Sequence, residues 1–318
     1  MSQKIHTVAI IGCGVIGMSW ACLFLAKGLK VIITDPVEGT EQRFKEYLDD
    51  AWPTLELQLG SIDQQQAKNY EFVDDIAPRL GSVDFIQENG PENVEFKQNL
   101  FKILDQHARS DIVIASSSSG LPSSVFIGKC EHQPDRILIG HPFNPPHLIP
   151  LVEVVPHVGT SSVAVSTALA FYRSLGKIPV LVRKEVPGFV ANRLQAAINA
   201  EAYSLISRGV ISAEDLDKAV TSGPGLRWAV TGPIVTNALG GGGGADGFST
   251  RLERLGPAIR GWEDDMHKHR FDWSEEMLSV LKADVAEYLA TVEWTQLTRQ
   301  RDSVLLQVLR SKSQTRED

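Results

Sequence analysis

Cysteine is scarce in this sequence, which argues against a disulfide-stabilised protein and against a metal site built from cysteines. Only Cys13, Cys22 and Cys130 occur, an odd number that a disulfide framework would not use in full. No C-x-x-C pair and no Cys/His spacing typical of a metal site is present. We therefore expect reduced thiols and no metal. Cys13 lies in a glycine-rich turn, where a thiolate near a helix N-terminus can be reactive; the alternative is a small side chain that the turn tolerates.

An excess of positive charge and long apolar runs are also missing. The 31 basic residues are outnumbered by 39 acidic ones, which gives a net charge of -8, so no basic surface for a nucleic-acid backbone is expected. No apolar run approaches the roughly 20 residues that cross a bilayer. Because the first predicted strand begins within the first ten residues, we expect neither a signal peptide nor a transit segment. These absences predict a cytoplasmic protein without nucleic-acid or membrane partners.

The chain begins with a predicted strand, a glycine turn and a helix. The apolar run 8–11 leads into Gly12, Gly14 and Gly17, and a helical pattern then continues to about residue 27. The first glycine permits a tight turn, the second lets the backbone approach a pyrophosphate, and the third lets the helix pack closely on the strand. The positive end of the helix dipole would face the phosphates. This pattern predicts a dinucleotide site.

An acidic residue follows the next predicted strand. The apolar run 30–34 ends at Asp35, and no arginine comes directly after it. A carboxylate at this place accepts hydrogen bonds from the adenosine ribose hydroxyls, and its charge repels a 2'-phosphate. The sequence therefore favours NAD over NADP.

Apolar runs and helical patterns alternate up to residue 186. Helices are expected near residues 39–59, 93–108 and 161–175, between short runs that indicate strands. This alternation predicts an α/β fold, a Rossmann-type, doubly wound and largely parallel sheet with helices on both faces. A length of 318 residues favours two domains. We expect an NAD-binding domain over residues 1–186 and an all-α substrate and dimerisation domain over residues 187–318.

The second predicted domain has helical signals only. A long helical pattern covers residues 189–208, Ser212 and Ser274 begin two more helices with capping signatures, and a last helix is expected to end near Arg310. The run Gly240–Gly244 lacks the Lys-Ser/Thr of a phosphate-binding loop. It predicts a turn, either a flexible one beside a site or a plain loop.

Polar residues occur where an open α/β sheet binds ligands, just past the strands. The serine run 116–119, His141 and Asn192 each follow a predicted strand, and Glu153 interrupts an apolar run. A neutral imidazole can take a proton from an alcohol, and a carboxylate can fix its tautomer. Singly, such residues are more often structural. Their joint position at one sheet edge makes His141 and Glu153 a candidate acid–base pair.

These motifs resemble the L-3-hydroxyacyl-CoA dehydrogenase family, and within it the lambda-crystallin or L-gulonate 3-dehydrogenase branch. The resemblance covers nearly the whole chain and implies an NAD-dependent oxidoreductase that acts on a CH–OH group. Its marks are the glycine motif 12–17, Ser116-Ser117-Ser118-Ser119-Gly120-Leu121, His141-Pro142-Phe143-Asn144-Pro145-Pro146, Leu151-Val152-Glu153-Val154-Val155 and Pro187-Gly188-Phe189-Val190-Ala191-Asn192-Arg193.

The resemblance also implies roles for individual residues. His141 is expected to be the general acid/base, with Glu153 as its partner, while Ser119 and Asn192 hydrogen-bond the substrate oxygen. The residues expected to contact the cofactor are Gly12, Gly14, Val15, Ile16, Gly17, Asp35, Glu92, Lys97 and Asn144.

One segment departs from the acyl-CoA branch. That branch usually has a Pro-Met-Gly-Pro type sequence where this chain has Gly225-Leu226-Arg227-Trp228. Arg227 offers a planar fork for a bidentate contact with a carboxylate, which a free hydroxy acid has and a CoA thioester lacks. A surface or interdomain ion pair is the alternative.

We therefore expect oxidation of the 3-hydroxyl of a small free hydroxy acid, with L-gulonate as the leading substrate. L-Carnitine is the closest competitor, because carnitine dehydrogenases resemble this branch and keep a similar Gly-Leu-Arg-Trp segment. Acyl-CoA oxidation comes third. A crystallin-like structural protein or a non-catalytic NAD-binding protein is the alternative of a different class. The family resemblance also implies a homodimer.

Overall fold

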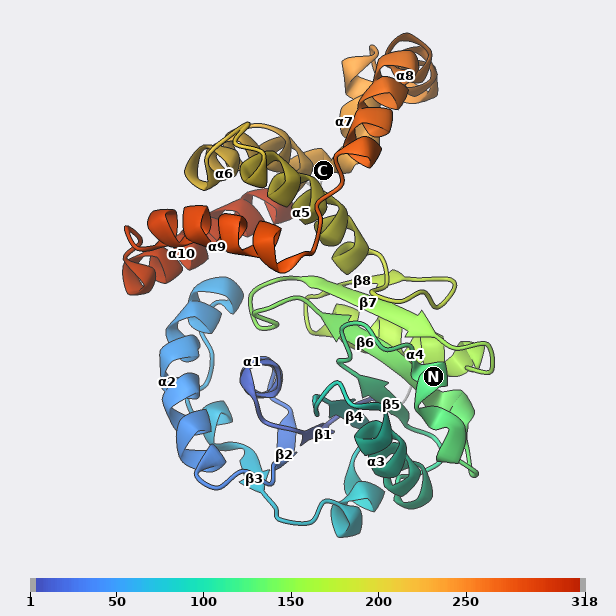
Figure 1. Ribbon diagram of the computed structural model, residues 1–318. Helices are drawn as coiled ribbons and strands as arrows, with labels where there is room; N and C mark the ends of the chain where they lie inside the picture. Colours follow the sequence, from blue (N-terminus) through green and yellow to red (C-terminus); the bar gives the residue numbers. More distant parts are fainter. Residues whose placement is uncertain (1–3, 315–318) are drawn as a thin grey trace. The chain divides into compact units, whose positions relative to one another are not determined.

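The computed structural model describes residues 4–314 (Figure 1). The chain divides into two compact units. Within the described residues, the first consists of residues 4–193 and 302–310, and the second of residues 194–301 and 311–314.

The first unit is built on one sheet of eight strands in the order β3-β2-β1-β4-β5-β6-β7-β8. All neighbouring strands are parallel except β6 and β7, which are antiparallel. The predicted doubly wound, largely parallel sheet is confirmed. The strands are β1 (Thr7–Ile11), β2 (Lys30–Thr34), β3 (Tyr70–Phe72), β4 (Phe85–Glu88), β5 (Val113–Ser116), β6 (Ile137–Pro142), β7 (Leu151–Pro156) and β8 (Ile178–Leu181).

Both faces of this sheet are covered by helices. In β1, Val8 and Ile10 belong to one core cluster and Ala9 and Ile11 to the other, because successive side chains point to opposite faces. The first cluster includes α1 (Val15–Ala26), α2 (Thr40–Leu59) and α4 (Ser162–Ser174), and the second includes α3 (Val94–His107). Figure 1 shows α1 and α3 on opposite sides of β1 and β4. Burial on both faces explains why the strands are continuous apolar runs.

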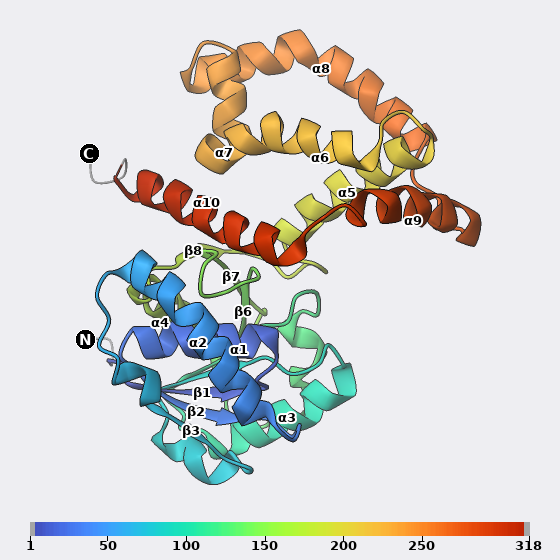
Figure 2. The same cartoon turned by 90° about the vertical axis from the view of Figure 1, so that its left-hand side faces the viewer.

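The remaining elements are helices, and most of their residues belong to the second unit (Figure 2). As predicted, Ser212 and Ser274 cap two of them through their side-chain oxygens. In the described part of the chain, none of the helices has the length and apolarity needed to cross a membrane. The helices are α5 (Ala191–Ser207), α6 (Ala213–Ser222), α7 (Pro224–Gly240), α8 (Gly244–Lys268), α9 (Glu275–Leu289) and α10 (Trp294–Gln314).

The glycine run forms the turn between α7 and α8. A Cβ atom on Gly241 would lie 1.9 Å from the carbonyl oxygen of Gly247, so only glycine fits where the two helices meet. The core of the second unit is small, with four buried apolar side chains in one cluster. In contrast, α7 exposes a row of apolar side chains, namely Leu226, Val230, Ile234, Val235 and Leu239.

Candidate active site

The three glycines after β1 differ in what surrounds them. Gly12 has φ +84°, and a Cβ there would lie 2.9 Å from the Asn89 backbone; a Cβ on Gly17 would lie 2.0 Å from the Gly12 carbonyl oxygen. A Cβ on Gly14 would meet nothing within 4 Å. Gly14 is therefore not required by packing within the chain. It leaves open the space at the N-terminus of α1 that a pyrophosphate needs, so the turn fits a dinucleotide.

Asp35 lies directly after β2 and faces this turn. Its Oδ2 accepts a hydrogen bond of 2.7 Å from the Cys13 backbone N–H, and its Oδ1 accepts one of 2.9 Å from Val37. Arg43, on the first turns of α2, donates to the Thr40 hydroxyl at 2.6 Å. The same Thr40 hydroxyl lies 3.4 Å from Asp35 Oδ1, so Thr40 connects the carboxylate expected to bind the ribose to the Arg43 guanidinium.

Asp35→Ser is expected to change the ratio of kcat/KM for NADP to that for NAD by about 10- to 100-fold in favour of NADP. The reason is that a hydrogen bond to a charged group contributes about 1.5 to 3 kcal/mol, and that Arg43 remains to attract a 2'-phosphate. Steady-state kinetics with both cofactors measure the ratio. Asp50→Ser, at an exposed acid of α2, is the matched control. An unchanged ratio would mean that Asp35 does not face the ribose.

Cys13 is an inert thiol in this environment. It is 1 % exposed, and burial, together with the nearby Asp35 charge, raises its pKa to about 12. A thiol is nucleophilic only as the thiolate. The structure therefore favours the small tolerated side chain over the reactive one.

Lys97 is buried beneath the end of β4. Its ammonium donates to both carboxylate oxygens of Glu88 at 2.8 Å, and the two side chains are 1 % and 0 % exposed. Glu88 also accepts a hydrogen bond of 2.6 Å from the Gly90 N–H. Lys97 thus stabilises the turn after β4 through Glu88, which the sequence analysis did not single out. A direct contact with the nicotinamide ribose does not follow from this geometry.

The serine loop after β5 brings three of the expected site residues together. Glu92 accepts hydrogen bonds from the hydroxyls of Ser118 and Ser119 at 2.9 and 3.0 Å. Asn192, at the start of α5, donates its side-chain N–H to the Ser119 carbonyl oxygen at 2.7 Å. Glu92, Ser119 and Asn192 therefore form one hydrogen-bonded group.

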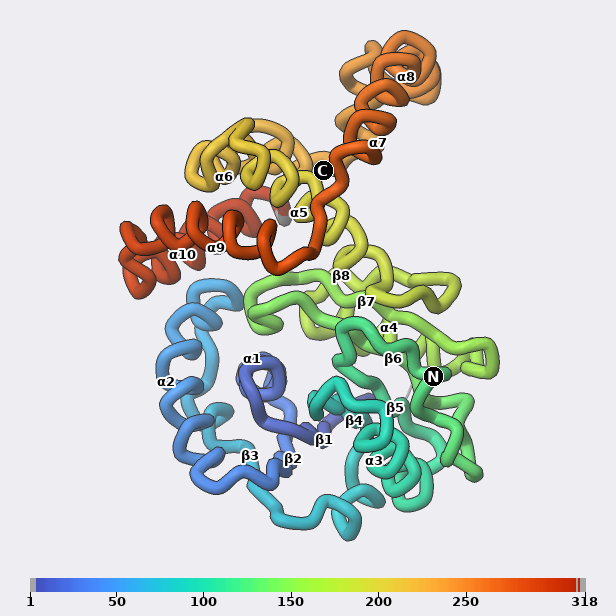
Figure 3. Tube along the Cα trace, viewed as in Figure 1, coloured from blue at the N-terminus to red at the C-terminus, as the bar shows by residue number. Residues whose placement is uncertain are grey.

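His141 and Glu153 face each other across the two antiparallel strands. They are directly opposed in the register of β6 and β7, and His141 Nδ1 lies 2.9 Å from Glu153 Oε2. Figure 3 follows the chain from β6 through the connection to β7. The rings of Phe143 and Phe189 lie 5.3 and 5.6 Å from the imidazole. The pair predicted from the sequence is thus a buried contact between two neighbouring strands.

Glu153 also binds the start of α5. Its Oε1 accepts hydrogen bonds from the backbone N–H groups of Val190 and Ala191 at 2.9 and 3.0 Å. Burial opposes ionisation of this carboxyl, but the hydrogen bonds from His141 and from these two N–H groups outweigh it, so the pKa of Glu153 lies below its usual range. The carboxylate is ionised at neutral pH and can only accept, which places the proton of a neutral His141 on Nδ1 and leaves Nε2 free as a base.

Phe189 is a site residue that sequence reasoning missed. It is fully buried and has φ +50°, a conformation that non-glycine residues rarely adopt. The Pro-Gly pair before it was the available signal, because it marks an irregular backbone. Its ring covers one side of His141.

Two expected residues lie outside these groups. Asn144 is exposed in the connection between β6 and β7, directly after Phe143. Arg227 is exposed on α7 in the second unit.

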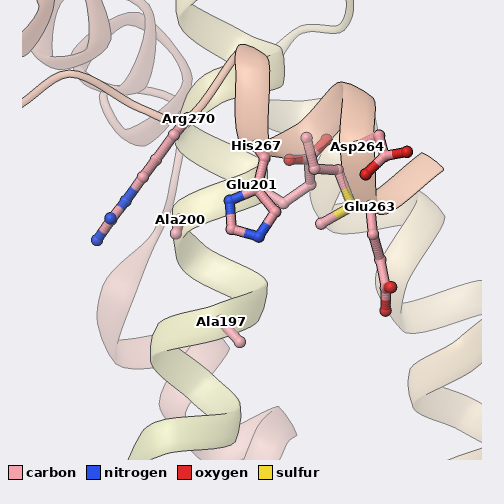
Figure 4. A pocket seen from close by; sticks show the side chains of 8 residues that line it. Ala197, Ala200, Glu201, Glu263, Asp264, His267 and Arg270 are labelled. Carbon is pink, nitrogen blue, oxygen red and sulfur yellow. The ribbon is translucent and has the colours of Figure 1, made fainter. Parts of the chain in front are cut away.

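The second unit has a pocket of its own, of about 540 Å³, between α5 and α8. Figure 4 shows its side chains, with Arg270 directed away from His267. Among residues 4–314 no group of three His, Cys, Asp or Glu side chains is suited to hold a metal ion. The lining residues are Ala197, Ala200, Glu201, Glu263, Asp264, Met266, His267 and Arg270.

A dinucleotide-binding turn and an acid–base pair lie at the carboxyl edge of one sheet. Together with the fold, they define a nucleotide-binding oxidoreductase. The chain belongs to the 3-hydroxyacyl-CoA dehydrogenase family. The family's NAD binding domain matches residues 7–186, and its C-terminal domain matches residues 188–254. The protein is an NAD-dependent dehydrogenase that acts on CH–OH groups.

Known relatives cover almost the whole chain. It is 67% identical over 312 residues to a "3-hydroxyacyl-CoA dehydrogenase" of Gibberella moniliformis, which covers 98% of this chain and 96% of the relative. An "L-carnitine dehydrogenase" of Streptomyces coelicolor is 37% identical over 97% of this chain and 95% of its own length. Among solved structures, a 5-formyl-3-hydroxy-2-methylpyridine 4-carboxylic acid 5-dehydrogenase, described as an NAD+ dependent dismutase, is 29% identical with a TM-score of 0.76 over 98% of this chain and 99% of that one.

Proposed function

We propose that the protein oxidises the 3-hydroxyl of a small free hydroxy acid to the 3-keto acid, with L-carnitine as the leading substrate. The observation that carries the proposal is the His141–Glu153 pair in a chain that is similar to L-carnitine dehydrogenases along nearly its full length. L-Gulonate, the leading expectation from the sequence, is not confirmed by these relatives. Their names favour L-carnitine, the first alternative, instead.

In the oxidative direction His141 removes the hydroxyl proton through Nε2. Glu153 holds the imidazole by its Nδ1–H and stabilises the imidazolium that forms. NAD, when bound, supplies the hydride acceptor. The steps that the chain performs are thus proton transfer and orientation.

Asn192 and Ser119 stabilise the oxygen as it becomes a carbonyl. The Asn192 amide donates one N–H to the Ser119 carbonyl oxygen and keeps a second N–H for the substrate. The Ser119 hydroxyl donates to Glu92, so it must turn away from Glu92 before it can donate to the substrate.

Arg227 is proposed to bind the substrate carboxylate, which would direct C3 to the cofactor. Arg227→Met is expected to raise KM for a free hydroxy acid by about 10- to 100-fold with a smaller change in kcat, since a charge-assisted hydrogen bond contributes about 1.5 to 3 kcal/mol. Initial rates over a range of substrate concentrations measure KM. Arg254→Met, at another exposed arginine of the second unit, is the matched control. An equal KM in both variants would contradict the proposal that Arg227 binds the substrate carboxylate.

L-3-Hydroxyacyl-CoA oxidation is the second candidate, because the relative from Gibberella moniliformis carries that name at 67% identity. An NADH absorbance assay with L-carnitine, L-gulonate and L-3-hydroxybutyryl-CoA separates the candidates. We expect the highest kcat/KM with L-carnitine. A preference for the thioester would overturn the free-acid proposal, and NAD binding without turnover of any substrate would contradict the whole proposal.

We further propose that residues 187–318 form the substrate and dimerisation domain, and that a homodimer forms through the part of this domain that lies in the second unit, Leu194–Arg301. The exposed apolar side chains of α7 and the small core of this unit support the dimer, because a large exposed apolar surface marks an interaction site. A cytoplasmic location is proposed from the three free cysteines, which fit a reducing compartment. Sedimentation equilibrium tests the dimer.

A further inference from the structure

A lysine is buried without a carboxylate partner beside the connection that joins the two catalytic strands. Lys177 lies between α4 and β8 and is 7 % exposed. Its ammonium donates to the backbone carbonyl oxygens of Pro146 and Ile149. No carboxylate between residues 4 and 314 forms an ion pair with it. Burying a lysine amino group costs folding free energy unless the group is hydrogen-bonded. The hydrogen bonds that Lys177 donates to this connection therefore indicate a role beyond packing.

The position of Lys177 is fixed from both sides. Its backbone N–H donates to the Tyr172 carbonyl oxygen at 3.0 Å, which holds it to the end of α4. The next residue, Ile178, donates to Pro150 at 2.8 Å and begins the pairing of β8 with β7. The ammonium lies 5.3 Å from the centre of the Trp20 ring. Lys177 is thus a rigid support rather than a mobile surface chain.

The protonation of this amine fits its contacts. Burial lowers the pKa of Lys177 to about 7, so a large fraction of the molecules carry the neutral amine at neutral pH. A neutral amine still has two N–H donors, one for each carbonyl oxygen.

The connection of residues 143–150 determines how β6 and β7 pair. The two carbonyl groups that Lys177 binds lie on either side of Leu148, whose backbone N–H donates to Pro145 at 3.0 Å. On its other side, the His147 N–H donates to the Ser19 hydroxyl of α1 at 2.8 Å. A shift of one residue in strand register would turn His141 or Glu153 to the opposite face of the sheet. The geometry of the acid–base pair therefore depends on this connection.

We propose that Lys177 is a positioning residue for the reaction: it holds the β6–β7 connection so that His141 stays paired with Glu153. The inference rests on the proposed function for its kinetic part. Lys177 itself does not touch substrate or cofactor.

Lys177→Met tests this role, because methionine keeps an apolar stem but donates no hydrogen bond. We expect kcat to fall by about 10- to 100-fold, as small misplacements of reacting groups do, with unchanged NAD affinity. The primary deuterium isotope effect on kcat, with substrate deuterated at the reacting carbon, is expected to rise, because hydride transfer becomes slower in every molecule. Lys27→Met, at a lysine at the end of α1, is the control and should leave both quantities unchanged.

Two further measurements separate positioning from loss of folded enzyme. Hydrogen exchange of the peptide covering residues 143–150 should become faster in Lys177→Met. This exchange rate can be measured whether or not the enzyme turns over a substrate. Lys177→Gln, which keeps two uncharged N–H donors, should retain more of kcat than Lys177→Met. A fall in kcat with an unchanged isotope effect, or unchanged exchange, would overturn the inference. A wild-type enzyme that oxidises none of the three substrates would instead refute the proposed function, with the exchange result still standing.

Discussion

His141→Ala is expected to lower kcat by about 10²- to 10⁴-fold, the range that a positioned general acid or base contributes. The imidazole is the proposed proton acceptor, and its loss leaves Glu153 without its hydrogen-bond donor on Oε2. NAD affinity should stay near that of the wild type, because the glycine turn and Asp35 directly follow β1 and β2, away from β6. Absorbance of NADH at saturating substrate gives kcat, and calorimetry gives the NAD dissociation constant.

The control for this variant is His157→Ala. His157 is also a buried histidine, 8 % exposed, and it contacts Pro134 and Gly159 rather than an acid. We expect its removal to affect the thermal midpoint more than kcat. If His141→Ala abolished NAD binding while His157→Ala did not, His141 would have a structural role in the cofactor site and the proposed mechanism would be wrong.

Glu153→Gln is expected to have the second largest effect, a fall in kcat of about 10²- to 10⁴-fold with little change in KM. The glutamine amide would donate to His141 Nδ1, which forces the proton of the neutral imidazole onto Nε2, and a wrong tautomer of this kind disables a general base. The glutamine oxygen can still accept from Val190 and Ala191, so the start of α5 keeps its cap.

The matched control is Glu153→Ala, which removes both contacts. We expect it to lose stability as well as kcat, since it leaves two backbone N–H groups without their acceptor. Thermal unfolding together with single-turnover rates distinguishes the two variants. A Glu153→Gln enzyme with nearly normal kcat would show that the carboxylate charge is not needed and that Glu153 only supports α5.

The sequence predicted the parts whose signals are local. The turn from Gly12 to Gly17 and the serine caps of α6 and α9 follow from a few neighbouring residues. The pairing of His141 with Glu153 was predictable because both lie next to one connection. In each case the residues close together in the sequence were sufficient to predict the local structure.

The parts that the sequence did not predict depend on distant contacts. Helix α7 is broken at Gly232, which has φ +69° and precedes Pro233, as helix propensity predicts. Helix α8, however, continues through Pro257 and adjoins a glycine run, so propensity argues against it. The burial of Lys97 against Glu88 depends on a contact between a strand and a helix that the sequence pattern does not show, while its cofactor contact stays a prediction. The choice among substrates depends on Arg227, whose exposure on α7 does not by itself identify a ligand.

The antiparallel pairing of β6 and β7 has a consequence for the order in which the protein becomes active. His141 and Glu153 belong to one hairpin, so their contact spans a short stretch of chain. The cofactor turn requires β1, β2 and β4, with Asn89 packed against Gly12 and Asp35 against Cys13, and those contacts close long loops. Because local contacts cost less loop-closure entropy, we expect the acid–base pair to assemble first during folding. The acid–base pair is thus encoded in one continuous segment of the chain, while the NAD site requires strands that are far apart in the sequence.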